Sequence, residues 1–276
     1  MEKVAGTIVA RTKKNLITEK IMHNNPLQFD LGLSEPPKKE EIPCEMLKIM
    51  PVSVIDISAQ KKRKSENHAK SSSRANYSPF PAEISDLCFE FFLRDCIKVF
   101  DPFAGWGERG LKAKEYGKDY TGFDVSPESI KVAGERGITN ILADSLTAQI
   151  PEFDGLITCP PYWNLETYGP DGIDRLKTWD DFKGNYRSIW ARVYDKAAPG
   201  STFCIMVGEW RKKHVYYDLE FVTRDIFNSL GAVIFDQVVV SRAKVSKIKI
   251  MLPQAKRLGY TVRVHESLLI FKKPLI

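Results

Sequence analysis

The chain has 276 residues, of which 43% are hydrophobic and 28% charged, and it carries a formal net charge of +6. Its 15 Phe, 10 Tyr and 5 Trp can build a sizeable core in one domain with additions or in two small domains, which excludes a wholly disordered chain. No apolar run reaches the roughly 20 residues of a membrane span, and no secretion signal opens the sequence, so we expect a cytoplasmic protein without a membrane segment.

The first 75 residues differ in texture from the rest. Residues 1–60 alternate short apolar stretches with PP, EIPCE and PVSV, which predicts an irregular extension with one or two short strands. Residues 61–75 consist largely of Lys, Arg and Ser, which is typical of a flexible linker. We therefore expect residues 1–75 to be an N-terminal extension with a basic linker, and residues 76–276 to form the catalytic domain.

From residue 76 onward, helical and strand patterns alternate. Helical spacing is found at 83–94, 111–119, 126–137, 178–198 and 219–230, whereas short apolar runs predict strands at 97–101, 120–124, 138–144, 153–159, 201–208, 232–241 and 261–271. This alternation predicts an α/β fold, with a mostly parallel seven-stranded sheet and helices on both faces. The last two strands have no helix between them, so we expect them to form a terminal antiparallel hairpin joined by residues 242–260.

The cysteines and histidines show no metal-binding pattern. The five cysteines form no CxxC pair, and the four histidines show neither HxxxH nor HxH spacing. We therefore expect a reduced protein without disulfides and without a structural metal.

The charges are unevenly distributed along the chain. Residues 61–75 carry six basic and one acidic side chain, residues 76–236 carry 18 basic and 25 acidic, and residues 237–276 carry nine basic and one acidic. An acidic middle between two basic zones favours a bound polyanion such as a nucleic acid. A solvated linker and a solvated hairpin explain the same charges equally well.

Polar side chains end four successive predicted strands. They are Asp101, Asp124, Asp144 and Cys159. Ligands of open α/β sheets bind at the carboxyl ends of the strands, so this regular placement predicts the site. Asp124 is placed to bond ribose hydroxyls, or it starts a turn before Ser-Pro; Asp144 is placed to bond an adenine amino group, or it caps the following turn.

A glycine-rich turn, DPFAGWG (101–107), follows the first strand of this series. Gly105 and Gly107 allow tight backbone angles and close approach to a ligand. GWGERG also fits the dinucleotide pattern GxGxxG, but the preceding DPFA and the later CPPYW argue against NAD.

The segment TCPPYW (158–163) is the most specific motif. Its two prolines fix the backbone and remove two N–H donors, which leaves carbonyl oxygens as acceptors. Tyr162 adds an aromatic face on which a base can stack. A turn rich in acceptors beside an aromatic ring suits an exocyclic amino group.

The chain resembles the S-adenosylmethionine-dependent amino-methyltransferases of nucleic acids, which include the DNA N4-cytosine and N6-adenine enzymes of restriction-modification systems. Four segments carry this resemblance: DPFAGWG, YTGFD, the Ala-Asp-Ser segment around Asp144, and TCPPYWNLETYG. The resemblance runs from SPFPAEI at about Ser78 to HESLLIFKK (265–273), roughly 70% of the chain, and it is greatest to compact phage-type members. It implies a class I, Rossmann-like methyltransferase fold that acts on DNA, with a target base flipped into the site.

The resemblance also implies roles for individual residues. The catalytic turn would comprise Cys159, Pro160, Pro161 and Tyr162, and no metal would take part. S-adenosylmethionine would contact Asp101, Phe103, Ala104, Gly105, Gly107, Asp124 and Asp144. The nucleic acid would contact Trp163, Arg242, Lys244, Lys247, Lys249, Lys256 and Arg257, because no large recognition insertion is evident elsewhere.

The chain departs from the family at Cys159. The family has Asp, Asn or Ser before the two prolines, and its oxygen accepts from the target amino group, whereas a thiol is a weak acceptor. Cysteine is closest in size to serine, the usual residue of N4-cytosine enzymes. The departure leaves several interpretations open: the Pro160 carbonyl suffices, the enzyme is slow, Cys159 attacks cytosine C6 as in C5-methylation, or the thiol only packs in the core.

Two other functions stay open. An RNA or tRNA amino-methyltransferase shares the glycine loop and the PPY turn. A catalytically inactive DNA-binding module of the same fold would keep Cys159 as a relic of lost activity.

Overall fold

The computed structural model describes residues 48, 50–57, 80–165, 172–212, 214–242 and 248–275. Apart from Leu275, these residues belong to one compact unit, Glu40–Pro274. The predicted linker 61–75 and most of the predicted extension lie outside the described residues. The division of the chain at residue 75 stays a prediction.

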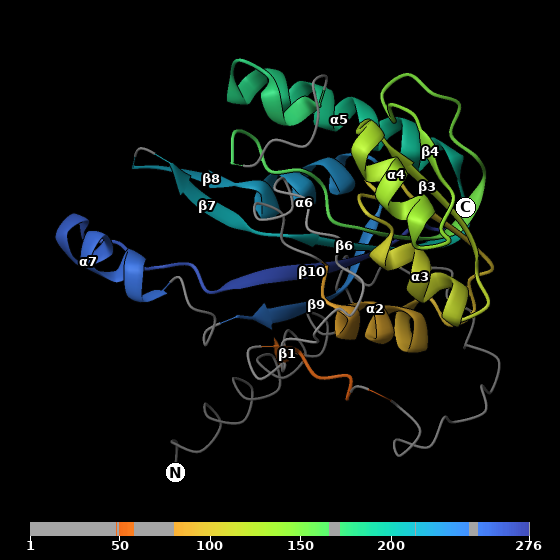
Figure 1. The fold of residues 1–276 in the computed structure, drawn as a ribbon, viewed down its shortest axis with the longest axis horizontal. Coiled ribbons are helices and arrows are strands. Elements are labelled where there is room, and N and C mark those ends of the chain that lie inside the picture. Colours follow the sequence, from red (N-terminus) through yellow and green to blue (C-terminus); the bar gives the residue numbers. More distant parts are fainter. Residues whose placement is uncertain are drawn as a thin grey trace, which may run out of the picture. The chain divides into compact units, whose positions relative to one another are not determined.

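An eight-stranded sheet forms the centre of this unit, in the order β1-β9-β10-β6-β5-β2-β3-β4 (Figure 1). β10 runs antiparallel to both of its neighbours, and every other pair in the sheet is parallel. This is the class I Rossmann-like methyltransferase fold, so the predicted fold class is confirmed. The strands are β1 (Val54–Asp56), β2 (Lys98–Asp101), β3 (Asp119–Asp124), β4 (Asn140–Leu142), β5 (Phe153–Thr158), β6 (Ala197–Val207), β9 (Val233–Ser241) and β10 (His265–Lys272).

The sheet has eight strands where the sequence predicted seven. The additional strand, β1, comes from the predicted N-terminal extension and pairs in parallel with β9 through Val54, Ile55 and Asp56. It is three residues long and lies at the sheet edge, which is why no alternation of apolar and polar residues marks it in the sequence.

The predicted helices are present, and side chains cap three of them. Ser126 accepts from the Ser129 amide at the start of α4, and Thr178 accepts from the Asp181 amide at the start of α5, as their positions in the sequence indicate. The helices are α2 (Ala82–Leu87), α3 (Glu108–Glu115), α4 (Pro127–Glu135), α5 (Trp179–Lys196) and α6 (Leu219–Ser229). α2 continues as a π-helix, η4 (Cys88–Phe92), and a short 3₁₀ helix, η5 (Ile173–Arg175), precedes α5.

Two segments differ from their predictions. The connection 242–260, which was predicted to be a hairpin loop, contains a helix, α7 (Ile248–Leu258), because its apolar residues recur at helical spacing. Residues 209–218, for which no element was predicted, form a small antiparallel hairpin of β7 (Glu209–Lys212) and β8 (Val215–Asp218). Both segments matter for the site, because both contribute to its walls.

The core has two layers, one on each face of the sheet. Alternate strand residues divide between them: Phe100, Leu156, Phe203 and Leu269 face α5 and α6. Their neighbours Val99, Ile157, Cys204 and Leu268 face α2, η4 and α3. This period of two is the mark of strands buried on both faces, and it fixes which strand ends reach the site.

Candidate active site

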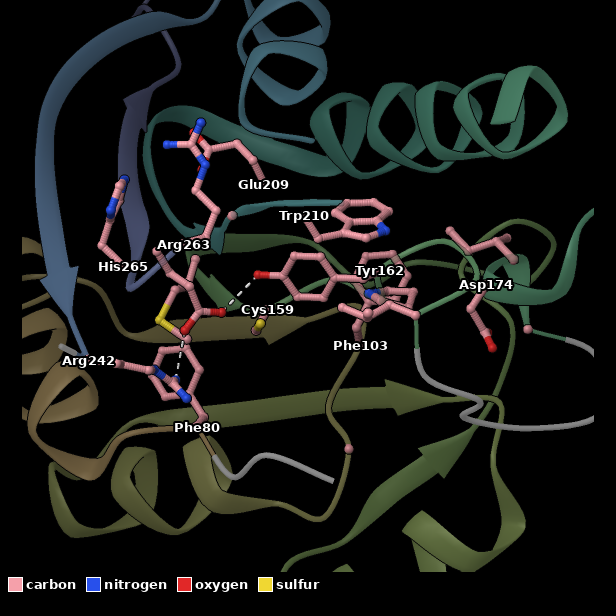
Figure 2. Close-up of a pocket in the computed structure, with 18 of the residues that line it drawn as sticks. Phe80, Phe103, Cys159, Tyr162, Asp174, Glu209, Trp210, Arg242, Arg263 and His265 are labelled. Carbon is pink, nitrogen blue, oxygen red and sulfur yellow. Dashed lines mark hydrogen bonds and ion pairs between the residues drawn. The ribbon is translucent and has the colours of Figure 1, made fainter. Parts of the chain in front are cut away.

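A cavity of about 640 Å³ opens at the carboxyl ends of β2, β3, β5 and β6. It lies where parallel strands of an open sheet place their ligands. Its lining combines the loop after β2 with the turn after β5 and with residues of β7 and β10 (Figure 2). The structure therefore brings together the glycine-rich turn and the CPPY turn, which are more than 50 residues apart in the sequence.

Asp101 organises the base of this site and does not line the cavity. Its carboxylate is fully buried and accepts hydrogen bonds from the Arg109 Nε (2.6 Å), the Thr158 Oγ1 (2.6 Å), the Tyr120 hydroxyl (3.0 Å) and the Phe103 amide (3.1 Å). Burial is the largest single influence on the pKa of Arg109 and lowers it, but the charge of Asp101, the hydrogen bond to that carboxylate and the neighbouring Tyr120 together raise the pKa more, so the net shift is upward. Asp101 thus joins β2, β3, β5 and α3, and its expected contribution to cofactor binding is indirect.

The glycine loop is shaped by two glycines with different surroundings. Gly105 has a φ of 56° and lines the cavity, and a Cβ added there would meet nothing within 4 Å. Gly107 has a φ of 82° but is absent from the cavity lining; a Cβ there would approach Ala133 Cβ to 3.2 Å. Gly105 therefore leaves room for a ligand, whereas Gly107 leaves room for α4. Phe103 and Ala104, the neighbours of Gly105, also line the cavity.

The two predicted acids after β3 and β4 face the cavity. Asp124 accepts from the Gly105 amide (2.8 Å) and from the Ser126 amide (2.8 Å), so it also holds the glycine loop in place. Burial raises the pKa of Asp124, and the two amide hydrogen bonds oppose that shift. Asp144 accepts from the Leu146 amide (2.8 Å), which is the capping role that the sequence left open beside ligand binding.

The CPPY turn forms the opposite wall. Cys159, Pro161 and Tyr162 line the cavity, whereas Pro160 is buried and does not. The Cys159 side chain is half-buried, so its thiol is within reach of a ligand and is not a purely internal packing group.

Tyr162 is held by a chain of polar contacts. Its hydroxyl donates to Glu266 Oε1 (2.9 Å), and Arg242 forms an ion pair with Glu266 Oε2 at 2.8 Å (Figure 2). Gly208 lies against this pair, since a Cβ there would approach Glu266 Cγ to 3.2 Å and the Tyr162 hydroxyl to 3.4 Å. The ring itself meets Trp210 edge-on, with centroids 5.3 Å apart. These contacts fix the position of the ring as a wall of the cavity.

The predicted nucleic-acid contacts are placed in different environments. Trp163 is buried, donates from Nε1 to the Leu176 carbonyl (2.8 Å) and packs on Trp179 and Tyr217, so the structure places it in the core. Arg242 lines the cavity and is paired with Glu266. Three others, Lys249, Lys256 and Arg257, are exposed on α7 and do not line the cavity. Lys244 and Lys247 lie outside the described residues.

Several lining residues were not predicted. Phe80, which carries the guanidinium of Arg109 over its ring at 4.9 Å, stands in the SPFPAEI segment that already resembled the family. Trp210 follows β6, at the carboxyl end of a parallel strand, which is where ligands of open sheets bind. Glu266 lies at the amino end of β10 and reaches the same edge because β10 runs antiparallel to its neighbours. Arg263 belongs to the basic stretch 237–265 of the sequence, whereas Arg211 has no comparable signal; the fold of β7, β8 and β10 brings both to the cavity.

Among the described residues, no helix is long and apolar enough to cross a membrane. The same part of the chain contains no group of three or more His, Cys, Asp or Glu side chains arranged to hold a metal ion.

Comparison with known proteins finds likeness in solved structures only. No protein-family model and no curated protein matches the chain. TrmN from Thermus thermophilus is 15% identical with a TM-score of 0.45, and the match covers 70% of this chain and 48% of that one, less than half of its length. An O-methyltransferase of a trans-AT PKS multienzyme from Brevibacillus brevis, in complex with S-adenosyl-L-homocysteine, is 12% identical (TM-score 0.48; 71% and 73% covered). Magnesium protoporphyrin IX methyltransferase (ChlM) from Synechocystis PCC 6803 with bound SAM is 12% identical (TM-score 0.45; 70% and 79% covered). At these values the likeness carries no argument about activity.

Proposed function

We propose that the protein is an S-adenosylmethionine-dependent methyltransferase that acts on an exocyclic amino group of a base in DNA, N4 of cytosine or N6 of adenine. One observation carries the proposal: a single cavity joins the glycine loop after β2 to the Cys159–Tyr162 turn after β5. The first feature suits a cofactor and the second suits an amino group, so the two reactants would meet in one space.

The residues present fit the cofactor. The volume of about 640 Å³ lies within the roughly 300–1,000 Å³ of small-molecule sites and leaves room for a second group. Gly105 leaves open space beside the loop, and Asp124 and Asp144 place carboxylates at the next two strand ends. In the proposal Asp124 accepts from the ribose hydroxyls, Asp144 lies near the adenine, and Phe103 and Ala104 complete the cradle.

The CPPY turn would hold the target. Tyr162 offers its ring for stacking and Trp210 closes the space behind it, while Cys159 faces the amino group as a weak acceptor. When bound, S-adenosylmethionine supplies an electrophilic methyl group. The target amino nitrogen would take this methyl group from the sulfur, and the proton that it gives up would pass to solvent at the mouth of the cavity. This chain would contribute by holding the two groups in line.

A nucleic acid is favoured as the substrate by the charges of the C-terminal region. Residues 237–265 contain seven basic and no acidic side chains, and the structure places α7 and the start of β10 from this stretch next to the cavity. Duplex DNA attracts such a surface through its phosphates. An RNA substrate is the alternative, since its phosphates have the same charge.

The proposal is tested by methyl transfer from radiolabelled S-adenosylmethionine to duplex DNA and, in parallel, to RNA of the same sequence. We expect label in the DNA, and a much lower rate of labelling with a Tyr162→Ala variant of similar cofactor affinity. Label in RNA alone would favour the RNA enzyme. Failure to bind cofactor would favour the inactive module.

A further inference from the structure

We propose that Arg211 and Arg263 form a clamp for the phosphates of the bound nucleic acid, with Tyr216 as the platform that holds both. This inference rests on the proposed function and adds the residues that grip the substrate. Neither arginine is among the contacts implied by the family resemblance, and they are 52 positions apart in the chain.

The clamp is built from contacts with one aromatic ring. The guanidinium of Arg211 lies 4.9 Å from the centroid of Tyr216, and that of Arg263 lies 5.0 Å from the same centroid. Arg263 also donates to the Tyr216 hydroxyl (3.0 Å), and Arg211 lies 5.1 Å from the Tyr260 ring. The two charges are therefore held within about 10 Å of each other. Two guanidinium groups at this separation can contact neighbouring phosphates of one strand.

These two arginines differ from most others in the described part of the chain. Ion pairs with carboxylates neutralise Arg94, Arg109, Arg136, Arg187, Arg224 and Arg242. Within the described residues, neither Arg211 nor Arg263 forms an ion pair, although Glu209 of the same hairpin lines the cavity too. Both side chains are exposed. The carboxylates of Glu209 and Asp218 act electrostatically on the same Tyr216 side chain. Among the described residues neither of them forms an ion pair with Arg211 or Arg263, so both guanidinium groups keep N–H donors for phosphate oxygens.

The position of the clamp suits a nucleic-acid backbone. Arg211, Arg263 and Tyr260 line the cavity, at the side formed by β7 and by the segment before β10. In Figure 2, Tyr162 and Trp210 lie in the centre, with Asp174 on the right and with Arg263 and His265 on the left. A base inserted against Tyr162 would leave its sugar and phosphates at the cavity mouth. Arginine suits this task because its planar guanidinium can stack on an aromatic ring and still donate to phosphate oxygens.

The clamp is tested by the salt dependence of binding to a DNA duplex of fixed sequence. Each phosphate contact that is lost lowers the slope of log affinity against log salt by about 0.9, so Arg211→Gln with Arg263→Gln should lower it by about 1.8. Between about 50 and 200 mM salt, wild-type affinity should then fall roughly tenfold more than that of the double variant. Lys131→Gln, an exposed lysine of α4 outside the cavity lining, is the matched control and should keep the wild-type slope.

The platform has its own test. Tyr216→Phe keeps the ring and should stay close to wild type, whereas Tyr216→Leu should weaken DNA binding in the same direction as the arginine variants. Arg211→Lys with Arg263→Lys keeps both charges and should restore most of the slope, which separates charge from folding defects. A double glutamine variant with wild-type melting temperature and wild-type slope would overturn the clamp alone. A wild-type protein that binds neither DNA nor RNA would overturn the clamp and the proposed function together. If the wild-type protein bound RNA only, and the double glutamine variant had a lower slope of log affinity against log salt for RNA, the clamp would be supported and the DNA substrate refuted.

Discussion

Replacing Asp101 by Asn should destabilise the fold far more than it affects any ligand directly. The carboxylate is fully buried, and the Arg109 side chain beside it is only 7% exposed. The substitution keeps the shape and removes the charge. Arg109 would keep the Phe103 carbonyl, the Phe80 ring and at most a neutral amide oxygen at position 101, but no negative charge.

The magnitude follows from the burial of both partners. Breaking a buried ion pair by removing one partner costs about 3–5 kcal/mol, because the other charge is left uncompensated. The pair is not exposed to solvent, so screening does not reduce this value. For a domain of this size, about 2–4 °C are lost per kcal/mol, which predicts a fall in melting temperature of roughly 6–20 °C.

Urea unfolding followed by tryptophan fluorescence measures the loss, with Asp101→Asn/Arg109→Met as the control. The double variant removes both charges and should be more stable than Asp101→Asn alone. The reasoning would be refuted by an Asp101→Asn protein within about 1 kcal/mol of wild type. Such a protein with lost cofactor affinity would instead show that Asp101 contacts the ligand directly.

Three further predictions concern the cavity. Gly105→Val should abolish S-adenosylmethionine binding in calorimetry. Gly117→Val is the control, because Gly117 has a similar φ of 64° but lies outside the cavity, and it should keep the affinity. Equal affinities in the two variants would refute the placement of the cofactor at this loop. Tyr162→Ala should lose base stacking of about 1–3 kcal/mol, and so about 5- to 150-fold in methyl transfer, with cofactor affinity within a few-fold; an unchanged rate would refute the role of the ring. Cys159→Ser should retain or raise activity, because a hydroxyl is the better acceptor; complete loss in a folded variant would indicate a thiolate attacking C6 and hence C5-methylation.

The regular part of the fold could be predicted because its signals are local. Strands β2, β3 and β5 are short, carry apolar residues near their carboxyl ends and each end in a polar residue. Ser126 and Thr178 mark helix starts through hydrogen bonds to their own first turn. Such patterns depend on neighbours a few residues away. The alternation between the two core layers follows from them.

The walls of the site could be predicted only in part, because they depend on distant contacts. Asp101 and Asp124 were expected at the cavity, yet only the folded chain shows that one binds Arg109 and the other the loop amide. Trp163 was predicted to contact nucleic acid, but Tyr217 of the β7–β8 hairpin packs on it. That hairpin has no turn signal in its sequence. Arg242 was predicted to contact a phosphate, whereas the structure pairs it with Glu266, 24 residues later in the chain.

The most direct test of the account is to express the protein, digest the host DNA to nucleosides and identify any methylated nucleoside by mass spectrometry, with Tyr162→Ala expressed in parallel. We expect N4-methylcytosine or N6-methyladenine above the background of the host, and strongly reduced amounts in cells that express the variant. C5-methylcytosine, or methylation confined to RNA, would contradict it.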